Sequence, residues 1–278
     1  MEQFENKVAI VTGGGSGIGK ALCAELAHRG SVVIVADVNE DWARQVASAI
    51  AQKGLHASPA RVDVSNEEDV CRLIRKTVSD YGRVDYMFNN AGIAIGGDAR
   101  DLSTEQWRRV LDVNLYGAIY GTMAAYRVMV KQGHGHIINT ASATGLLPQP
   151  GNAPYCTSKH GIVGLSLSLR CEGADLGVKV SAVCPGRVET NILQSAVIVN
   201  IPREQVIARF RLMSATKAAH VILRGVARNQ ALIVFPLSIR LAWRVYRLVP
   251  RAADPIGVRI MRNLRRIRIA PAPSGTPE

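Results

Sequence analysis

Residues 7–19 read KVAIVTGGGSGIG, a short apolar run that passes directly into a glycine-rich turn. The run has the length and composition of a buried parallel strand. Residues 20–28 are rich in Ala and Leu and stop shortly before Gly30, which is typical of a helix with a glycine at its end. A strand, a glycine turn and a helix N-terminus form an anion site, because unpaired N–H groups and the helix dipole face the same point. The stretch therefore predicts an α/β fold that can hold a pyrophosphate.

Strand-like apolar runs alternate with helical stretches along the rest of the chain. This alternation predicts a doubly wound, Rossmann-type α/β fold, in which helices cover both faces of a parallel sheet. The 278 residues suit a single domain with a sizeable core, which we expect to span residues 1–236. We expect residues 237–269 to form a basic amphipathic helical extension and residues 270–278 to be a disordered tail.

Asp37 ends the next apolar run and comes roughly 20 residues after the glycines, where an acid can accept hydrogen bonds from the adenosine ribose. The same carboxylate would repel a 2′-phosphate, and neither Ser16 nor Val38 offers a cation to offset it. The sequence therefore favours NAD over NADP. A solvated loop aspartate is the alternative interpretation.

Tyr155 and Lys159 are four residues apart and would share one face of a helix. A free tyrosine has a pKa of about 10, and a neighbouring ammonium group is expected to lower it. Tyr155 could then exchange a proton with a substrate hydroxyl, while Ser142 holds the substrate oxygen. The ordinary alternatives are a solvated helix face for the pair and a capping role for the serine.

Taken together and in this order, the motifs resemble the short-chain dehydrogenase/reductase family over about residues 5–236. The resemblance implies a sheet of seven strands and a catalytic tetrad of Asn114, Ser142, Tyr155 and Lys159. It also implies that Asn114 anchors a water linked to Lys159, and that Lys159 contacts the nicotinamide ribose. Tyr155 and Lys159 belong to the expected cofactor site as well, together with Gly13, Gly15, Ser16, Gly17, Ile18, Gly19, Asp37, Asp63, Val64, Asn90, Ala91, Gly92, Pro185, Gly186, Val188 and Thr190.

The substrate-covering segment of the family corresponds to residues 190–213, which are rich in aliphatic side chains: Ile192, Leu193, Val197, Ile198, Val199, Ile201, Ile207, Phe210 and Met213. An apolar cover suits a hydrophobic alcohol or ketone of the steroid, retinoid or acyl-chain type, unless these residues only pack the cover itself. Two other functions stay open. An NADP-linked reductase of 3-oxoacyl thioesters is disfavoured by Asp37, and a nucleotide-sensing binding protein is disfavoured by the complete tetrad.

The positive charge of the chain is concentrated near its C-terminus. Nine arginines against one acid between residues 240 and 268 give +8 of the total +12. Residues 237–249 thread aliphatic and aromatic side chains between arginines and are too short and too charged to span a bilayer. Three roles remain open: attachment to a membrane surface, packing over the substrate cleft or a subunit interface, and nucleic-acid binding. The last is least favoured because no recognition module is present.

Five scattered cysteines argue against a disulfide framework and for a reducing compartment. The N-terminus enters the first strand within a few residues, so we expect no signal peptide and a cytoplasmic protein, with peripheral membrane association if the extension binds lipid. His134 and His136 lack a ligand partner nearby and are expected in a solvated turn, so no metal site is predicted. The resemblance, with Gly161 and Gly164 on one helix, predicts a homodimer or homotetramer.

Overall fold

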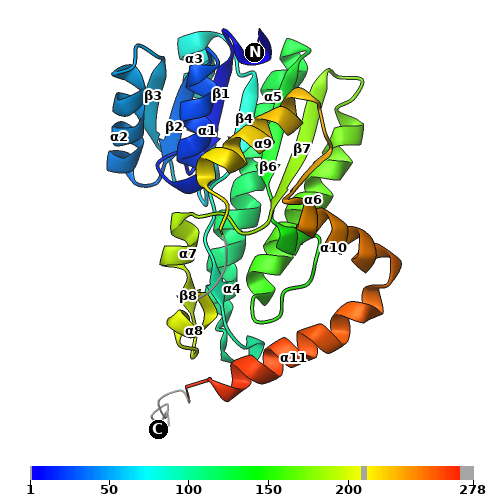
Figure 1. Cartoon of the computed structure of the whole chain (residues 1–278). Helices are drawn as coiled ribbons and strands as arrows, with labels where there is room; N and C mark the ends of the chain where they lie inside the picture. The colour runs from blue at the N-terminus through cyan, green and yellow to red at the C-terminus, as the bar shows by residue number, and fades with distance from the viewer. Residues whose placement is uncertain (1, 208–211, 270–278) are drawn as a thin grey trace.

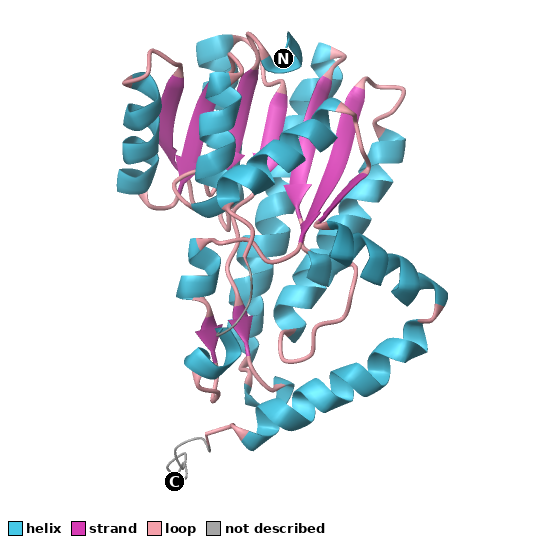
Figure 2. Ribbon diagram, in the orientation of Figure 1, coloured by secondary structure: helices cyan, strands magenta, loops and turns pink. Residues whose placement is uncertain are grey.

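In the computed structural model, which describes residues 2–207 and 212–269, a parallel sheet lies between two layers of helices (Figures 1 and 2). The order of its seven strands is β3-β2-β1-β4-β6-β7-β9. Their bounds are β1 (Val8–Thr12), β2 (Val32–Asp37), β3 (Ala57–Arg61), β4 (Tyr86–Asn89), β6 (Gly135–Thr140), β7 (Val178–Pro185) and β9 (Leu232–Phe235). Every neighbouring pair is parallel, which confirms the predicted doubly wound sheet of seven strands.

The two faces of the sheet are covered by separate sets of helices. Successive side chains of a strand point to opposite faces, so Val11 packs on one side of the sheet and Ile10 on the other. The first side carries α1 (Gly17–His28), α2 (Glu40–Ala51) and α9 (Ala215–Ala227). The second side carries α3 (Glu67–Tyr81), α5 (Gly117–Gln132) and α6 (Ala153–Glu172). The strands β1, β2, β4, β6 and β7 are therefore largely buried on both faces, as their apolar sequences require, whereas the edge strand β3 is partly exposed.

A smaller group of elements lies beyond the carboxyl ends of the strands (Figure 1). It includes α4 (Thr104–Leu111), α7 (Asn191–Ser195), α8 (Arg203–Ile207) and a parallel pair formed by β5 (Ile95–Gly96) and β8 (Val197–Ile198). The pair joins the chain that follows β4 to the segment that follows β7. These elements enclose the space into which the strand ends point.

The residues after β9 form α10 (Leu237–Leu248), a short turn η5 (Pro250–Ala252) and α11 (Ala253–Arg266). Figure 1 shows α10 leaving the sheet near α6, and α11 turning back across the end of the molecule that lies beyond the strand ends. Within the described part of the chain, no helix is long and apolar enough to cross a membrane. The tail predicted at residues 270–278 lies outside the described residues.

The expectation for His136 was wrong. Strand β6 already begins at Gly135, so His136 is a strand residue with only 2% of its surface exposed. Its Nε2 atom lies 2.8 Å from the Ser181 hydroxyl on the neighbouring strand. Burial lowers the pKa of His136 to about 3, which keeps the ring neutral inside the sheet.

Candidate active site

The glycine turn brings bare backbone to the end of β1. Gly13 and Gly17 have φ angles of +62° and +51°, a region that favours glycine over residues with a side chain. A methyl group on Gly19 would overlap the carbonyl oxygen of Gly13, so the start of α1 can approach the turn only without a Cβ. The side of the turn that faces the cleft therefore has room for a ligand.

The N-terminus of α1 differs from those of its neighbours in having no side-chain cap. Asn39 and Asn66 accept hydrogen bonds from the first turns of α2 and α3, whereas the Ser16 side chain makes no such bond. The first N–H groups of α1 therefore remain free to bind an anion, and the helix dipole favours a negative charge there. This arrangement fits the pyrophosphate of a dinucleotide.

Two acids follow the neighbouring strands. The two carboxylate oxygens of Asp37 accept hydrogen bonds from the backbone N–H groups of Gly15 (2.9 Å) and Asn39 (3.0 Å), which fixes the acid beside the glycine turn. Asp63 accepts from the N–H and hydroxyl of Ser65, at 3.0 and 2.6 Å. Both acids line the same cleft as the glycine turn.

Asn90 joins the glycine turn to the end of β4. The hydroxyl of Thr12 accepts hydrogen bonds from the N–H groups of Asn90 (3.0 Å) and Ala91 (3.2 Å). The Asn90 amide in turn donates to the carbonyl of Thr12, at 3.1 Å. The floor of the cleft is therefore a single hydrogen-bonded unit.

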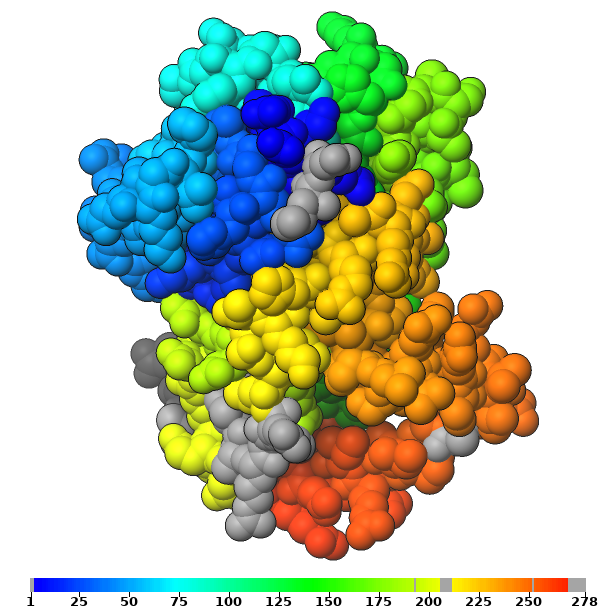
Figure 3. All heavy atoms as spheres, turned by 45° about the horizontal axis from the view of Figure 1, so that its top comes forward, coloured from blue at the N-terminus to red at the C-terminus, as the bar shows by residue number. Residues whose placement is uncertain are grey.

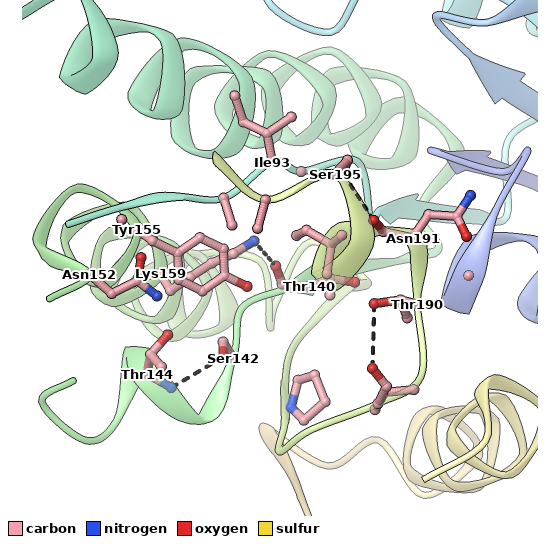
Figure 4. A pocket seen from close by; sticks show the side chains of 18 of the residues that line it. Ile93, Thr140, Ser142, Thr144, Asn152, Tyr155, Lys159, Thr190, Asn191 and Ser195 are labelled. Carbon is pink, nitrogen blue, oxygen red and sulfur yellow. Dashed lines mark hydrogen bonds between the residues drawn. The ribbon is translucent and has the colours of Figure 1, made fainter. Parts of the chain in front are cut away.

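Figure 4 shows Ser142, Tyr155 and Lys159 directed toward the same space. The Lys159 ammonium donates to the carbonyl of Thr140 at 2.8 Å, and its Nζ atom is 5.4 Å from the centroid of the Tyr155 ring. The Ser142 hydroxyl accepts from the N–H of Thr144 at 3.2 Å. The helical spacing of Tyr155 and Lys159 on α6 thus brings both side chains beside the serine that follows β6.

Asn114 belongs to a π-helical turn, η3 (Asp112–Tyr116), an irregularity that is frequent at functional sites. Its side chain accepts from the N–H of Ile93 (2.8 Å) and donates to the Ile93 carbonyl (2.9 Å) and the Ser158 hydroxyl (3.3 Å). Asn114 therefore ties the chain after β4 to α6 from behind the cleft. The water that the family resemblance implies for Asn114 stays a prediction.

The expectation of a lowered Tyr155 pKa was wrong for the protein without ligand. Burial raises the pKa of Tyr155 to about 12, and the hydrogen bond with Ser142 opposes this rise only in part. Burial also lowers the pKa of Lys159 to about 8. Both shifts have the same cause, because an environment of low polarity disfavours the charged form of each group. The ammonium is directed at the Thr140 carbonyl, so its charge does not offset this cost.

The segment after β7 closes the cleft on the remaining side. The N–H of Gly186 donates to the Phe235 carbonyl at 2.7 Å, which ties the segment to β9. A methyl group on Gly17 would lie 3.0 Å from the Thr190 side chain, so Thr190 reaches the glycine turn. The strands β1 and β7 are thereby linked across the cleft.

The cleft has a volume of about 2260 Å³ and is shared by most of the predicted site residues. Of the predicted set, Gly15, Gly19 and Asn114 do not line it and instead pack behind its walls. Ile192, Val197, Ile198, Ile201 and Met213 of the predicted cover also line the cleft. Val199 packs against Gly97 instead, while the side chains of Leu193 and Ile207 and the whole of Phe210 lie outside the described residues.

Several residues of the cleft were missed from the sequence. Thr144, Gln149 and Asn152 extend the site beyond Ser142. The C-terminal extension, for which packing over the cleft was one of the open roles, contributes Ile239 of α10 and Ile260 and Leu264 of α11, which were not predicted individually. The available signal was the recurrence of apolar side chains at 260, 261 and 264, the spacing of one helix face. Nothing in that spacing says which part of the protein the face contacts.

The fold and the cleft define a class of protein: an oxidoreductase that binds NAD or NADP at the carboxyl ends of a parallel sheet. Residues 7–198 match the family model described as short chain dehydrogenase. The chain belongs to the short-chain dehydrogenase/reductase family, and it is an oxidoreductase that acts on alcohol groups.

Curated relatives cover most of the chain. An oxidoreductase named SadH from Mycobacterium tuberculosis is 33% identical over 247 residues, which cover 86% of this chain and 90% of the relative. A cyclohexanol dehydrogenase from an Acinetobacter species is 37% identical over 69% of this chain and 76% of its own. A 3β-hydroxysteroid dehydrogenase from Eggerthella lenta is 36% identical, with 67% and 72% covered.

Solved structures show the same architecture. A short-chain dehydrogenase/reductase from Burkholderia phymatum in complex with NAD superposes with a TM-score of 0.84 and is 29% identical. The match covers 91% of this chain and 96% of that one. A 3-ketoacyl-(acyl-carrier-protein) reductase from Brucella melitensis complexed with NADH gives a TM-score of 0.73 at 27% identity, covering 84% and 96%.

Proposed function

We propose that the protein is an NAD-dependent dehydrogenase of hydrophobic secondary alcohols, with Tyr155 as the general acid/base. The observation that carries the proposal is a single cleft that is lined by Asp37, by Tyr155 and Ser142, and by aliphatic side chains of the cover and the extension. The cleft thus combines a nucleotide site, a proton donor and an apolar substrate site.

Ser142, Tyr155 and Lys159 have different tasks in the proposed reaction. Tyr155 takes the hydroxyl proton during oxidation and returns it during reduction. Ser142 donates a hydrogen bond to the substrate oxygen and holds it against the phenol. Lys159 keeps a positive charge close to the phenol ring and contacts the nicotinamide ribose. The bound cofactor accepts or supplies the hydride.

The preference for NAD rests on the surroundings of Asp37. Its carboxylate lines the cleft beside Val38 and Trp42, neither of which can neutralise a 2′-phosphate. Arg61 is paired with Asp37 in the strand register, but it is not among the described residues that line the cleft. A 2′-phosphate would therefore meet the aspartate without a compensating cation.

The proposed substrate class rests on the lining of the outer cleft and on the names of the relatives. Ile192, Val197 and Ile201 come from the cover, and the two relatives named for a substrate are dehydrogenases of cyclohexanol and of a 3β-hydroxysteroid. Reduction of a 3-oxoacyl thioester is the second candidate, because one solved neighbour is named as a reductase of that kind.

We also propose a homodimer or homotetramer with α6 at an interface. A methyl group on Gly161 would lie 2.9 Å from Leu115 of the same chain, so this glycine serves internal packing. Apart from the neighbouring residues and the backbone of α6 itself, no described atom lies within 4 Å of the place of a methyl group on Gly164. Leu167, one turn further, is 37% exposed, so this face of α6 can receive a helix of a second copy.

Contact between the extension and an anionic membrane surface is a further proposal. Leu241, Val245 and Leu248 form an exposed apolar stripe on α10, at 50%, 59% and 83% exposure. Arg244 and Arg247 lie beside this stripe. Such a surface suits an interface between lipid headgroups and acyl chains.

A panel of alcohols tests the proposed reaction. With NAD, the wild-type protein should oxidise a 3β-hydroxysteroid and cyclohexanol, and Tyr155→Phe should lower turnover by about 10²–10⁴-fold while leaving the Kd for NAD unchanged. Ser142→Ala should shift the pH dependence of oxidation toward alkaline pH, because the hydrogen bond that lowers the Tyr155 pKa is lost. Thr144→Val is the control and should leave the pH profile in place. Near wild-type turnover by Tyr155→Phe would contradict the mechanism.

The cofactor preference can be measured without turnover. The wild-type protein should bind NAD more tightly than NADP, and Asp37→Ala combined with Val38→Arg should shift the ratio of the two Kd values toward NADP. Asp41→Ala removes a nearby exposed acid and should leave the ratio unchanged. Tighter binding of NADP by the wild-type protein would refute the proposed preference.

Light scattering tests the proposed assembly. The wild-type protein should have the mass of a dimer or tetramer, and Gly164→Arg should reduce it, because the long charged side chain would enter the proposed helix interface. Circular dichroism should show an unchanged fold, since the described chain leaves this space open. A monomeric wild-type protein at micromolar concentration would exclude the proposal.

Vesicle co-sedimentation tests the membrane proposal. The protein should pellet with anionic vesicles at low salt and be released at 1 M salt, where the Debye length falls to about 3 Å. A variant with Arg240→Glu, Arg244→Glu and Arg247→Glu should bind less, because each basic residue near an anionic surface contributes about 1 kcal/mol. Failure of the wild-type protein to pellet at low salt would exclude the proposal.

A further inference from the structure

The helix α11 presents one face to the rest of the protein and the other to solvent. Its half-buried positions are 253, 257, 261 and 264, which recur every three to four residues. The side chains of Ile260 and Leu264 line the cleft that contains Tyr155. Figure 3 shows α11, in red, along the edge of the molecule next to α10, in orange.

The inward face of α11 packs against the loop that connects the two catalytic side chains. A methyl group on Gly151 would lie 3.0 Å from Cδ1 of Leu264, and one on Gly257 would lie 3.2 Å from Cγ of Pro150. Pro150 and Gly151 belong to the chain between Ser142 and Tyr155. Any movement of α11 would therefore reach the loop that joins the serine to the tyrosine.

Two ion pairs fasten the C-terminal end of α11. Nε of Arg265 lies 2.7 Å from a carboxylate oxygen of Asp98, and Nε of Arg268 lies 2.7 Å from one of Asp101. The side chains of both acids are almost fully buried, at 6% and 5% exposure. Hydrogen bonds from the two arginines hold the pKa of each acid below its usual range, although burial acts in the opposite direction.

The extension is attached on both sides of the cleft. At its start, Ile239 of α10 packs beside Gly186, whose missing side chain leaves room for it. At its end, the N–H of Ile269 donates to the carbonyl of Asn200 at 2.9 Å, and Asn200 lies in the segment that covers the cleft. The extension thus runs from the end of β9 to the opposite rim, where Asp98 precedes the short turn η2 (Ala99–Asp101) and Asp101 ends it.

We propose that α11 is the far wall of the substrate cleft, held by the Asp98–Arg265 and Asp101–Arg268 ion pairs, and that Ile260 and Leu264 select alcohols with a large apolar body. The inference rests on the proposed function, whose substrate class it narrows. With its hydroxyl at Tyr155, a polycyclic alcohol has more apolar surface to place against the Ile260 and Leu264 side chains of the same cleft than a single ring has. The arginines are directed at the acids, so the wall offers the substrate aliphatic side chains.

Kinetics with two probes test the wall. Leu264→Ala and Ile260→Ala should each lower kcat/KM for a 3β-hydroxysteroid about tenfold or more, since losing apolar contacts in a pocket has effects of this size. The value for cyclohexanol should not change. Ile256→Ala, on a residue of α11 that is 63% exposed, is the matched control and should affect neither alcohol. An unchanged ratio of the two kcat/KM values in Leu264→Ala and Ile260→Ala would overturn the proposal.

Hydrogen exchange tests the ion pairs independently of turnover. Arg268→Glu should speed exchange of the α11 amides, and adding Asp101→Lys to it should restore slow exchange by reversing the pair. Arg259→Glu makes the same charge change on α11 itself, outside both ion pairs, and it should leave exchange as in the wild-type protein. Equal exchange rates in Arg268→Glu and the wild-type protein would show that the pair does not hold α11.

A binding measurement distinguishes failure of this inference from failure of the proposed function. If the wild-type protein oxidises neither alcohol, calorimetric titration of the 3β-hydroxysteroid in the presence of NADH replaces the kinetic measurement. Weaker steroid binding by Leu264→Ala, with Ile256→Ala unchanged, would support the wall although the proposed reaction had failed. Equal binding by all three proteins, or no binding by the wild-type protein, would overturn the inference.

Discussion

The site depends on the hydroxyl of Thr12, the last residue of β1. It donates to the Phe88 carbonyl at 3.3 Å and accepts the N–H groups of Asn90 and Ala91, so β1 and β4 are locked together where both strands end. In the strand order, the chain reverses its winding direction between these two strands. Doubly wound sheets bind ligands at this reversal, because the loops that follow the two strands part in opposite directions. The cleft is therefore a consequence of topology, and the Thr12 bonds fix its floor.

The sequence was informative wherever a local pattern determines geometry. Apolar runs predicted the strands, the glycines predicted the turn after β1, and the spacing of Tyr155 and Lys159 placed both side chains on one face of α6. Prediction from the sequence failed where burial by distant segments determines the environment of a residue. His136 is neutral because β7 covers it, and Arg265 meets Asp98 across 167 positions of the chain. No local pattern contains such contacts, which arise only when the whole chain has folded.

The pKa values of Tyr155 and Lys159 illustrate a conflict that is common at functional sites. From the sequence, the charge of Lys159 was expected to lower the pKa of Tyr155, and burial of the pair was not considered. In the folded protein, burial disfavours the charge on both, so the pKa of the phenol rises to about 12 and that of the ammonium falls to about 8. Predictions from local sequence fail most often at functional sites, because residues there are selected for activity at the expense of stability. The phenol is thus held neutral beside Ser142, in the form that donates a proton.

The basic extension combines two different kinds of arginine. Arg265 and Arg268 form ion pairs with acids whose side chains are buried. A buried carboxylate that loses an ion-pair partner is destabilised, so the two pairs favour the observed position of α11. Arg240, Arg244 and Arg247 lie on α10, where every residue is at least partly exposed, so their charges stay in contact with water. Net charge alone could not separate these two groups, since each arginine adds the same single charge to the +12 of the chain. The ion pairs with acids on the opposite rim of the cleft distinguish the first group from the second, whose helix has no buried residue.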